Sequence, residues 1–131
     1  MRSFDATRDR RAPRRYRGMT LQGEMVQGEF ASPTLVLAVK EDCLGCQSVL
    51  ESPEGAFGDV STLIVAARPS IEPFWRTSQH RVLVSELLLL ELDVRWPPFY
   101  VLIDPSSETV LSEGVVFAPE QVREEIAPYL M

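Results

Sequence analysis

The sequence predicts an α/β domain in which apolar strands alternate with short helices. A continuous apolar run at 34–39, rich in branched side chains, indicates a buried strand, and a second such run lies at 61–67. Between the two runs lie the only cysteines of the chain, Cys43 and Cys46, followed by a stretch of helical character. Because a helix separates the two strands, we expect them to pair in parallel.

The length and composition indicate a single globular domain. The chain has 131 residues, of which 45% are apolar and 24% are charged. Its most apolar stretch, the four leucines at 87–90, is far shorter than the roughly 20 residues that a membrane helix requires. We therefore expect no membrane span.

The first 22 residues differ in charge from the rest of the chain. Residues 1–20 contain seven arginines and two aspartates, whereas the remainder contains six basic and 17 acidic residues. With few apolar groups to bury, residues 1–22 are predicted to form a basic, disordered arm ahead of a folded domain at 23–131. Such an arm can bind nucleic acid, but simpler alternatives are a solvated tail, an arm folded back on the acidic domain, and a true start at Met19 or Met25.

The arginine pairs at 10–11 and 14–15 do not belong to an export signal. Such a signal needs an apolar segment of roughly 7–15 residues, and none follows the arginines before the fold begins. We therefore expect a cytoplasmic location, where a close cysteine pair is more often a reactive dithiol than a structural disulfide. Nucleic acid is not an expected partner.

The other elements are predicted from apolar periodicity and from helix breakers. Residues 25–30 form either a short first strand or an approach to the strand at 34–39. Pro53 ends the helix that begins at the cysteines. After the strand at 61–67 we expect, in order, a helix at 71–79 capped by Ser70, a strand at 81–84, a helix at 85–92, a strand at 99–104, a hairpin partner at 109–117 and a final helix at 120–130.

The spacing of the two cysteines predicts a reactive pair. Positions three apart lie on one face of a helix, so the two sulfurs can reach each other and form a reversible disulfide. Cys43 would lie at the helix N-terminus, where free N–H groups favour the thiolate, and would attack; Cys46 would resolve the mixed disulfide. The simpler alternative is two small buried side chains that meet by chance. A zinc site is not expected, because the two cysteines and His80 fall short of four ligands.

A second segment, further along the chain, completes a pattern found in a known family. Residues 94–104 read Val-Arg-Trp-Pro-Pro-Phe-Tyr-Val-Leu-Ile-Asp. Together with the strand, the Cys-x-x-Cys pair and the helix, this segment resembles the TlpA-like, thioredoxin-type disulfide reductases of bacteria over about residues 25–131. The resemblance implies a thioredoxin-like three-layer fold, with a central mixed sheet of four to five strands flanked by helices. It also implies a cis-proline beside the disulfide; the spacing to Asp104 favours Pro98, and Pro97 is the alternative.

The resemblance further implies a thiol–disulfide oxidoreductase. Its catalytic residues would be Cys43 as nucleophile and Cys46 as resolving cysteine, and its substrate-binding residues Leu44, Gly45, Trp96, Pro97 and Pro98. No cofactor and no metal are implied. The implied partners are a protein or small-thiol disulfide substrate and an electron donor, either a reductase or a low-molecular-weight thiol.

Three departures from the family pattern favour an alternative, a thioredoxin-fold binding or redox-sensing module without efficient catalysis. Leu37 stands where thioredoxins place a buried, proton-relaying aspartate. Asp42, next to Glu41, disfavours a thiolate at Cys43 by its charge. Pro97, before the favoured cis-proline, has no N–H to donate to an extended substrate peptide. A peroxiredoxin-like peroxidase is a third candidate, but no threonine or arginine arrangement around Cys43 would activate a peroxide.

Overall fold

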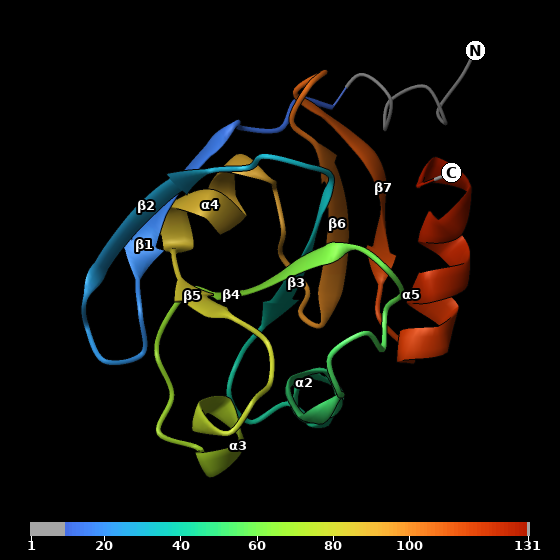
Figure 1. The fold of residues 1–131 in the computed structure, drawn as a ribbon. Helices are drawn as coiled ribbons and strands as arrows, with labels where there is room; N and C mark the ends of the chain where they lie inside the picture. The colour runs from blue at the N-terminus through green and yellow to red at the C-terminus, as the bar shows by residue number, and fades with distance from the viewer. Residues whose placement is uncertain (1–9, 131) are drawn as a thin grey trace.

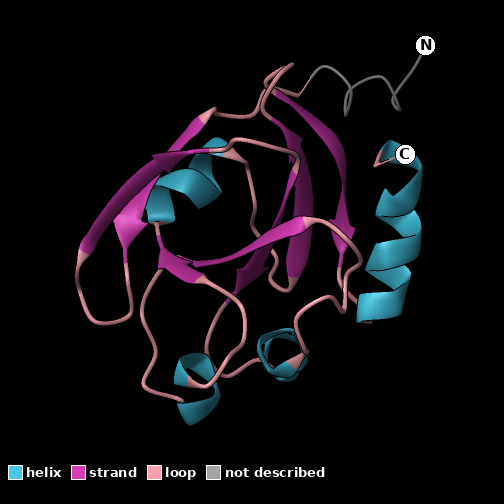
Figure 2. Ribbon diagram, in the orientation of Figure 1, coloured by secondary structure: helices cyan, strands magenta, loops and turns pink. Residues whose placement is uncertain are grey.

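A computed structural model describes residues 10–130 of the chain. In this part a mixed sheet of seven strands runs through the molecule in the order β2-β1-β5-β4-β3-β6-β7, with helices on both faces (Figure 1, Figure 2). The strands are β1 (Arg15–Met19), β2 (Met25–Glu29), β3 (Thr34–Val39), β4 (Ser61–Ala66), β5 (Val82–Val84), β6 (Phe99–Asp104) and β7 (Thr109–Val115). The helices are α2 (Leu44–Glu51), α3 (Pro73–Arg76), α4 (Glu86–Glu91) and α5 (Pro119–Ile126), followed by the 3-10 turn η1 (Ala127–Tyr129).

The centre of the sheet is parallel, as the sequence predicts. β3 and β4 pair in parallel from Thr34 opposite Ser61 to Val39 opposite Ala66, and β5 extends the parallel part beyond β4. On the other side of β3, β6 runs antiparallel and continues into a hairpin with β7. The carboxyl ends of β3 and β4 therefore lie together, and the cysteines follow β3 at this end of the sheet.

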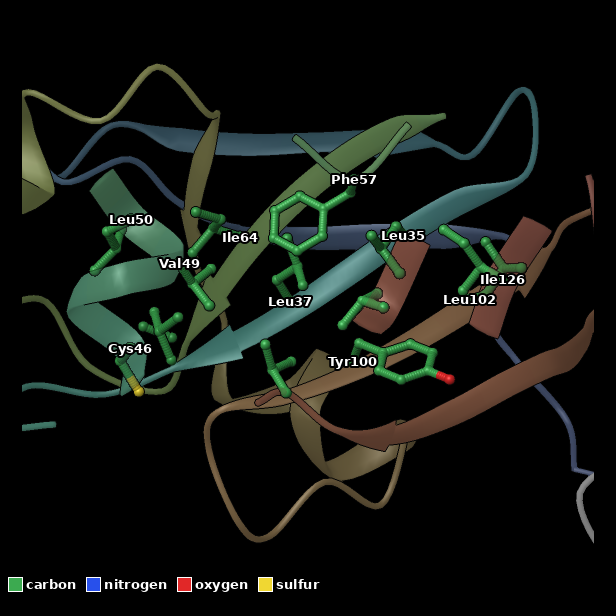
Figure 3. Close-up of a cluster of buried hydrophobic side chains, with 14 of the residues drawn as sticks. Leu35, Leu37, Cys46, Val49, Leu50, Phe57, Ile64, Tyr100, Leu102 and Ile126 are labelled. Atoms are coloured by element: carbon green, nitrogen blue, oxygen red, sulfur yellow. The ribbon is translucent and has the colours of Figure 1, made fainter. Parts of the chain in front are cut away.

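Two hydrophobic cores fill the space between the sheet and its helices. Leu35 and Leu37 of β3 point into the core that α2 and α5 cover, whereas Val36 and Ala38 point into the core on the α4 side. This alternation follows from the period of two along a strand. Cys46 belongs to the first core (Figure 3). The three-layer α/β architecture expected from the sequence is confirmed.

The sheet has more strands than the four to five expected, because a hairpin extends it at one side. β1 and β2 pair antiparallel, from Arg15 opposite Glu29 to Met19 opposite Met25. The pairing of Met19 with Val84 joins this hairpin to β5. Gly18 permits the close approach, since a Cβ at this position would collide with the carbonyl oxygen of Val84.

The expectation of a disordered arm over residues 1–22 is wrong for residues 10–22. Ala12 is buried, and its N–H donates to the carbonyl oxygen of Glu108 over 2.9 Å. Arg10 forms an ion pair with Glu113 of β7. The arginines of β1 are exposed, so the basic composition is compatible with strand pairing through the backbone. The fold thus includes residues from Arg10 onward, and residues 1–9 of the expected arm lie outside the described residues.

The remaining elements differ from their expected bounds mainly at helix ends. Residues 25–30, left open between a strand and an approach segment, contain β2. The helix expected at 71–79 is only the short α3. The final helix, expected at 120–130, ends at Ile126 because Pro128 cannot continue the helical hydrogen bonding.

The leucine run at 87–90 is divided between the core and the surface. Leu88 and Leu89 are buried, whereas Leu87 and Leu90 are 47% and 70% exposed. This division is what a short amphipathic helix on a sheet produces. Within residues 10–130, no helix combines the length and the apolar character that a membrane span requires.

Candidate functional site

The two cysteines lie where the chain leaves β3 and enters α2. Cys43 is the N-cap residue of α2, and Cys46 lies in the first turn of this helix. Their sulfurs form a disulfide, with the two Cα atoms 5.2 Å apart. The helical spacing therefore brings the pair together, as the sequence predicts.

The two sulfurs differ in exposure and in hydrogen bonding. Cys46 is fully buried and lies at one end of the core under α2 (Figure 3), whereas Cys43 is partly exposed. The backbone N–H of Cys46 donates to Sγ of Cys43 over 3.2 Å, and the N–H of Lys40 donates to Sγ of Cys46 over 3.4 Å. A solvent-borne disulfide can therefore reach Cys43 first, where an N–H donor at a helix start favours the thiolate.

Pro98 packs against the helical turn that carries the cysteines. The peptide bond between Pro97 and Pro98 is cis, so Pro98 is the cis residue of the two candidates. A Cβ on Gly45 would lie 2.9 Å from Cγ of Pro98, which is too close for any side chain without a shift. The structure thus brings Gly45 of α2 against the segment that leads into β6.

The other substrate-binding residues expected from the sequence lie at accessible positions. Leu44 is 85% exposed and Trp96 is 74% exposed, so both present apolar surface to solvent. Pro97 lines a groove of about 400 Å³ between α4, the loop after β4 and the segment before β6. Lys40 and Glu41, which precede the cysteine turn, line the same groove. These residues are placed so that a docked partner can contact them.

Two residues hold the loop before Cys43: Ser70, which the sequence analysis expected only as a helix cap, and Glu72, which is the actual N-cap of α3. The carboxylate of Glu72 accepts the backbone N–H of Asp42 over 3.2 Å, and the hydroxyl of Ser70 donates to the carboxylate of Glu41 over 3.0 Å. Asp42 has φ of 58°, a left-handed conformation at the bend from β3 into α2. The bonded partners are 30 and 29 positions apart, so no local sequence signal indicates them.

The comparison with known proteins finds its matches among solved structures. No protein-family model and no curated protein matches the sequence. The structure is similar to DsbF of MTB, with a TM-score of 0.68, 16% identity, and coverage of 89% of this chain and 98% of that chain. It is also similar to a putative thiol:disulfide interchange protein DsbE from Chlorobium tepidum, with a TM-score of 0.67, 17% identity, and coverage of 92% and 96%. This chain has the thioredoxin fold.

A further match, StoA from Bacillus subtilis, has a TM-score of 0.64 and 15% identity over 86% of this chain and 96% of that chain. These identities establish a shared thioredoxin fold, while the chemistry has to be argued from the site itself. The resemblance to thioredoxin-like proteins expected from the sequence is confirmed at the level of the fold.

In this thioredoxin fold, the buried residue at position 37 is a leucine and not an acidic residue. Leu37 pairs with Tyr100 across β3 and β6 and is fully buried. A leucine has no titratable proton, so the side chain at this position cannot exchange one with Cys46 or Cys43. Any proton that the cysteines release has to leave by another route.

Carboxylates instead gather on the loop that leads to Cys43. Glu41 and Asp42 are the two residues that precede Cys43, and the carboxylate of Glu72 accepts the backbone N–H of Asp42. Negative charge beside a thiol opposes the thiolate, whereas the N-terminus of α2 favours it. The reactivity of Cys43 therefore depends on two opposing electrostatic influences.

His80 lies at the far end of α2 from Cys43. Its Nε2 is 2.9 Å from the hydroxyl of Ser52, the C-cap residue of α2, and its Nδ1 is 3.4 Å from the hydroxyl of Thr62 on β4. Burial lowers the pKa of the His80 imidazole, because a buried site disfavours the charged form, although hydrogen bonding with the backbone of Ser52 and the charge of Glu54 oppose this shift. His80 thus joins α2 to β4 and takes no part in the cysteine site.

Proposed function

We propose that this protein is a thiol–disulfide oxidoreductase that uses Cys43 as nucleophile and Cys46 as resolving cysteine. The observation that carries the proposal is the unequal cysteine pair at the start of α2. One sulfur is accessible and accepts a backbone N–H, and the other is buried within disulfide distance of the first. This inequality gives each cysteine one of the two roles that disulfide exchange requires.

The reaction follows from these positions. The thiolate of reduced Cys43 attacks one sulfur of a substrate disulfide, which forms a mixed disulfide and releases the other substrate sulfur as a thiolate that takes up a proton. The thiolate of Cys46 then attacks the sulfur of Cys43, forms the intramolecular disulfide and releases the second substrate thiol. Two electrons pass from the cysteine pair to the substrate. A reductase or a low-molecular-weight thiol returns them.

We assign substrate docking to Leu44, Gly45, Trp96, Pro97 and Pro98. Leu44 and Trp96 expose apolar surface, and Pro98 packs beside Gly45 next to the disulfide. Pro97 has no N–H, so at this residue an extended peptide can pair only with the carbonyl oxygen. A protein or small-thiol disulfide that relies mainly on apolar contacts fits this surface better than one that relies on strand pairing.

A second candidate function is a binding or redox-sensing module without efficient catalysis. Leu37, which offers no proton relay, and the carboxylates of Glu41 and Glu72 support it, because both features slow the formation of a reactive thiolate. The module would open and close the same disulfide but would exchange it slowly with substrates.

Variants of the two cysteines separate these candidates. For an oxidoreductase, Cys43→Ser abolishes the reduction of insulin disulfides, and Cys46→Ser accumulates a mixed disulfide because the resolving step is lost. The mixed disulfide is detected as a mass increase that dithiothreitol reverses.

The binding or sensing module predicts a different outcome. It is supported if the wild type and the double serine variant bind a partner equally and the wild type does not reduce insulin. The cytoplasmic location stays a prediction, which cell fractionation checks.

A further inference from the structure

We propose that Glu72 is a positioning residue for Cys43, which holds the loop ahead of this cysteine and lowers the reactivity of its thiol by charge. The proposal deepens the function proposed above and rests on it for its catalytic meaning. The contacts of Glu72, however, are properties of the fold, and they can be tested without measuring catalytic turnover.

The carboxylate of Glu72 bridges the loop and the core. Oε2 accepts the backbone N–H of Asp42 over 3.2 Å, and Oε1 accepts the indole N–H of Trp75 over 2.9 Å. Trp75 is 1% exposed and belongs to the same hydrophobic core as Cys46. Glu72 therefore ties the backbone next to Cys43 to a residue that packing holds in place.

A second bond supports the same loop one residue earlier. The backbone N–H of Glu72 donates to the hydroxyl of Ser70 over 3.1 Å, and this hydroxyl donates to the carboxylate of Glu41 over 3.0 Å. The segment before α3 thus contacts two consecutive residues of the bend. Asp42 is held there in its left-handed conformation, with φ of 58°, immediately before the N-cap of α2. Because an N-cap directs its side chain at the first free N–H groups, this bend determines where Sγ of Cys43 lies.

The charge of Glu72 acts on the thiol from a fixed position. Both of its oxygens accept hydrogen bonds, so the carboxylate cannot swing away from the loop as an exposed Asp42 side chain can. A fixed negative charge at the backbone of Asp42, the residue before Cys43, disfavours the thiolate of this cysteine, and only the thiolate reacts with a disulfide or an alkylating reagent. Removal of this charge should therefore raise the reactivity of Cys43.

The test is the alkylation rate of Cys43 in the reduced protein, measured with iodoacetamide in a Cys46→Ser background so that a single thiol reacts. Glu72→Gln keeps the shape of the side chain and removes its charge. We expect its rate near pH 7 to be roughly threefold to tenfold higher than that of the parent, because a larger fraction of Cys43 is then thiolate. The matched control is Glu54→Gln, which removes the same charge from an exposed position beyond the other end of α2. A Glu72→Gln rate equal to the Glu54→Gln rate would overturn the proposal.

Two measurements keep the test valid if a substitution perturbs the fold. In the parent protein, a rise in salt concentration screens the charge and should increase the alkylation rate, and the increase should be smaller in Glu72→Gln. The chain has two tryptophans, so the ¹H–¹⁵N indole signals of Trp75 and Trp96 can be assigned with Trp96→Phe. Glu72→Gln should move the Trp75 signal and leave the Trp96 signal in place. An unmoved Trp75 signal would show that the bridge is absent in solution.

The outcomes distinguish this proposal from the proposed function. If the cysteine pair forms no reversible disulfide but Glu72→Gln still accelerates alkylation of Cys43, the oxidoreductase function fails and the role of Glu72 stands. If the wild type reduces insulin and Glu72→Gln behaves as Glu54→Gln does, the function stands and the role of Glu72 fails.

Discussion

Cys43 and Cys46 differ in their exposure to solvent, and this difference between two residues is the basis of the proposed reaction. Cys46 is buried in the core, and Cys43 is accessible to solvent at the N-cap of α2. Cys46 can therefore attack Cys43 but cannot easily meet a substrate. Position 45 between them is equally constrained, because the ring of Pro98 occupies the space that a side chain would need.

Gly45→Ala tests the contact between the cysteine turn and Pro98. The added Cβ would lie 2.9 Å from Cγ of Pro98, so the ring has to move away from the disulfide. We expect insulin reduction to fall roughly threefold to tenfold, because displacement of a docking residue lowers the rate of a reaction that depends on alignment. The free energy of unfolding should change by only about 1 kcal/mol, since alanine is also the better helix former.

Ser48→Ala, an exposed position one turn later in α2, is the matched control for Gly45→Ala. It should leave both the reduction rate and the unfolding free energy close to those of the wild type. An unchanged reduction rate in Gly45→Ala would show that the position of Pro98 does not matter for exchange.

At this scale the sequence predicts the cysteines and Pro98 but not the residues that hold them. The spacing of Cys43 and Cys46 is a local signal, and a helix translates it directly into proximity. The contacts of Glu72 depend on where the loop after β4 meets the loop after β3, which is a property of the sheet order. No pattern around position 72 carries this information.

α2 is the element around which the site is built, and contacts fix both of its ends. Its N-terminus carries the cysteines, and at its C-terminus Ser52 donates to the carbonyl oxygen of Val49 and contacts His80. His80 therefore links α2 to Thr62 of β4. This contact therefore fixes the C-terminal end of α2 to the sheet, at the opposite end of the helix from Cys43.

His80→Gln tests this link through the pH dependence of stability. The folded state lowers the pKa of His80, so below about pH 6.5 the unfolded chain binds more protons than the folded protein. The contribution of His80 to stability is therefore complete above pH 6.5 and is lost as the pH falls through the lowered folded value. Urea unfolding between pH 5.5 and 7.5 should show a loss of stability on acidification in the wild type and a weaker loss in His80→Gln.

His80 is the only histidine of the chain, so few other groups titrate in this range. Thr62→Val is the control, because it removes one contact of the imidazole and keeps the titrating group. It should retain the pH dependence of the wild type. Equal pH dependence in the wild type and in His80→Gln would show that titration of His80 does not contribute to stability.

The whole molecule differs from its predicted form by the hairpin that β1 and β2 add to the sheet. This hairpin covers the side of β5 that would otherwise be an open edge, and β1 also contacts α4. The hydroxyl of Ser85 donates to the carbonyl oxygen of Arg17 over 2.6 Å, which fixes the hairpin to the start of α4. The basic N-terminal region is thus part of the structural domain from Arg10 onward.

Gly18→Ala tests whether this attachment stabilises the domain. A Cβ at position 18 would lie 2.9 Å from Cβ of Ser85 and closer still to a backbone carbonyl oxygen, so β1 has to shift away from β5. We expect a loss of about 1–3 kcal/mol in the free energy of unfolding, as for other overpacked sites. Arg17→Ala, an exposed neighbour on the same strand, should stay within about 0.5 kcal/mol of the wild type. Equal stability of the two variants would mean that β1 is not held against β5 in solution.

The sequence predicts the central strands of the sheet better than the β1–β2 hairpin at its edge. β3, α2, β4 and the β6–β7 hairpin appear near their expected positions, because buried strands have continuous apolar runs and because breakers bound them. β1 has no such apolar run and is not predicted. Its arginines are exposed, and its pairing with β2 and β5 involves the backbone and a glycine. The extra strands therefore come from nonlocal pairing that composition does not indicate.

The most direct test of the proposed function is an equilibrium redox titration of the Cys43–Cys46 pair. Thiol alkylation is followed across a series of dithiol buffers, and Cys46→Ser serves as the control that cannot close the disulfide. We predict a reversible two-electron transition with a midpoint between roughly −270 and −120 mV, the range of thioredoxin-fold oxidoreductases. Failure of the pair to form an intramolecular disulfide at any of these potentials would contradict the proposed function.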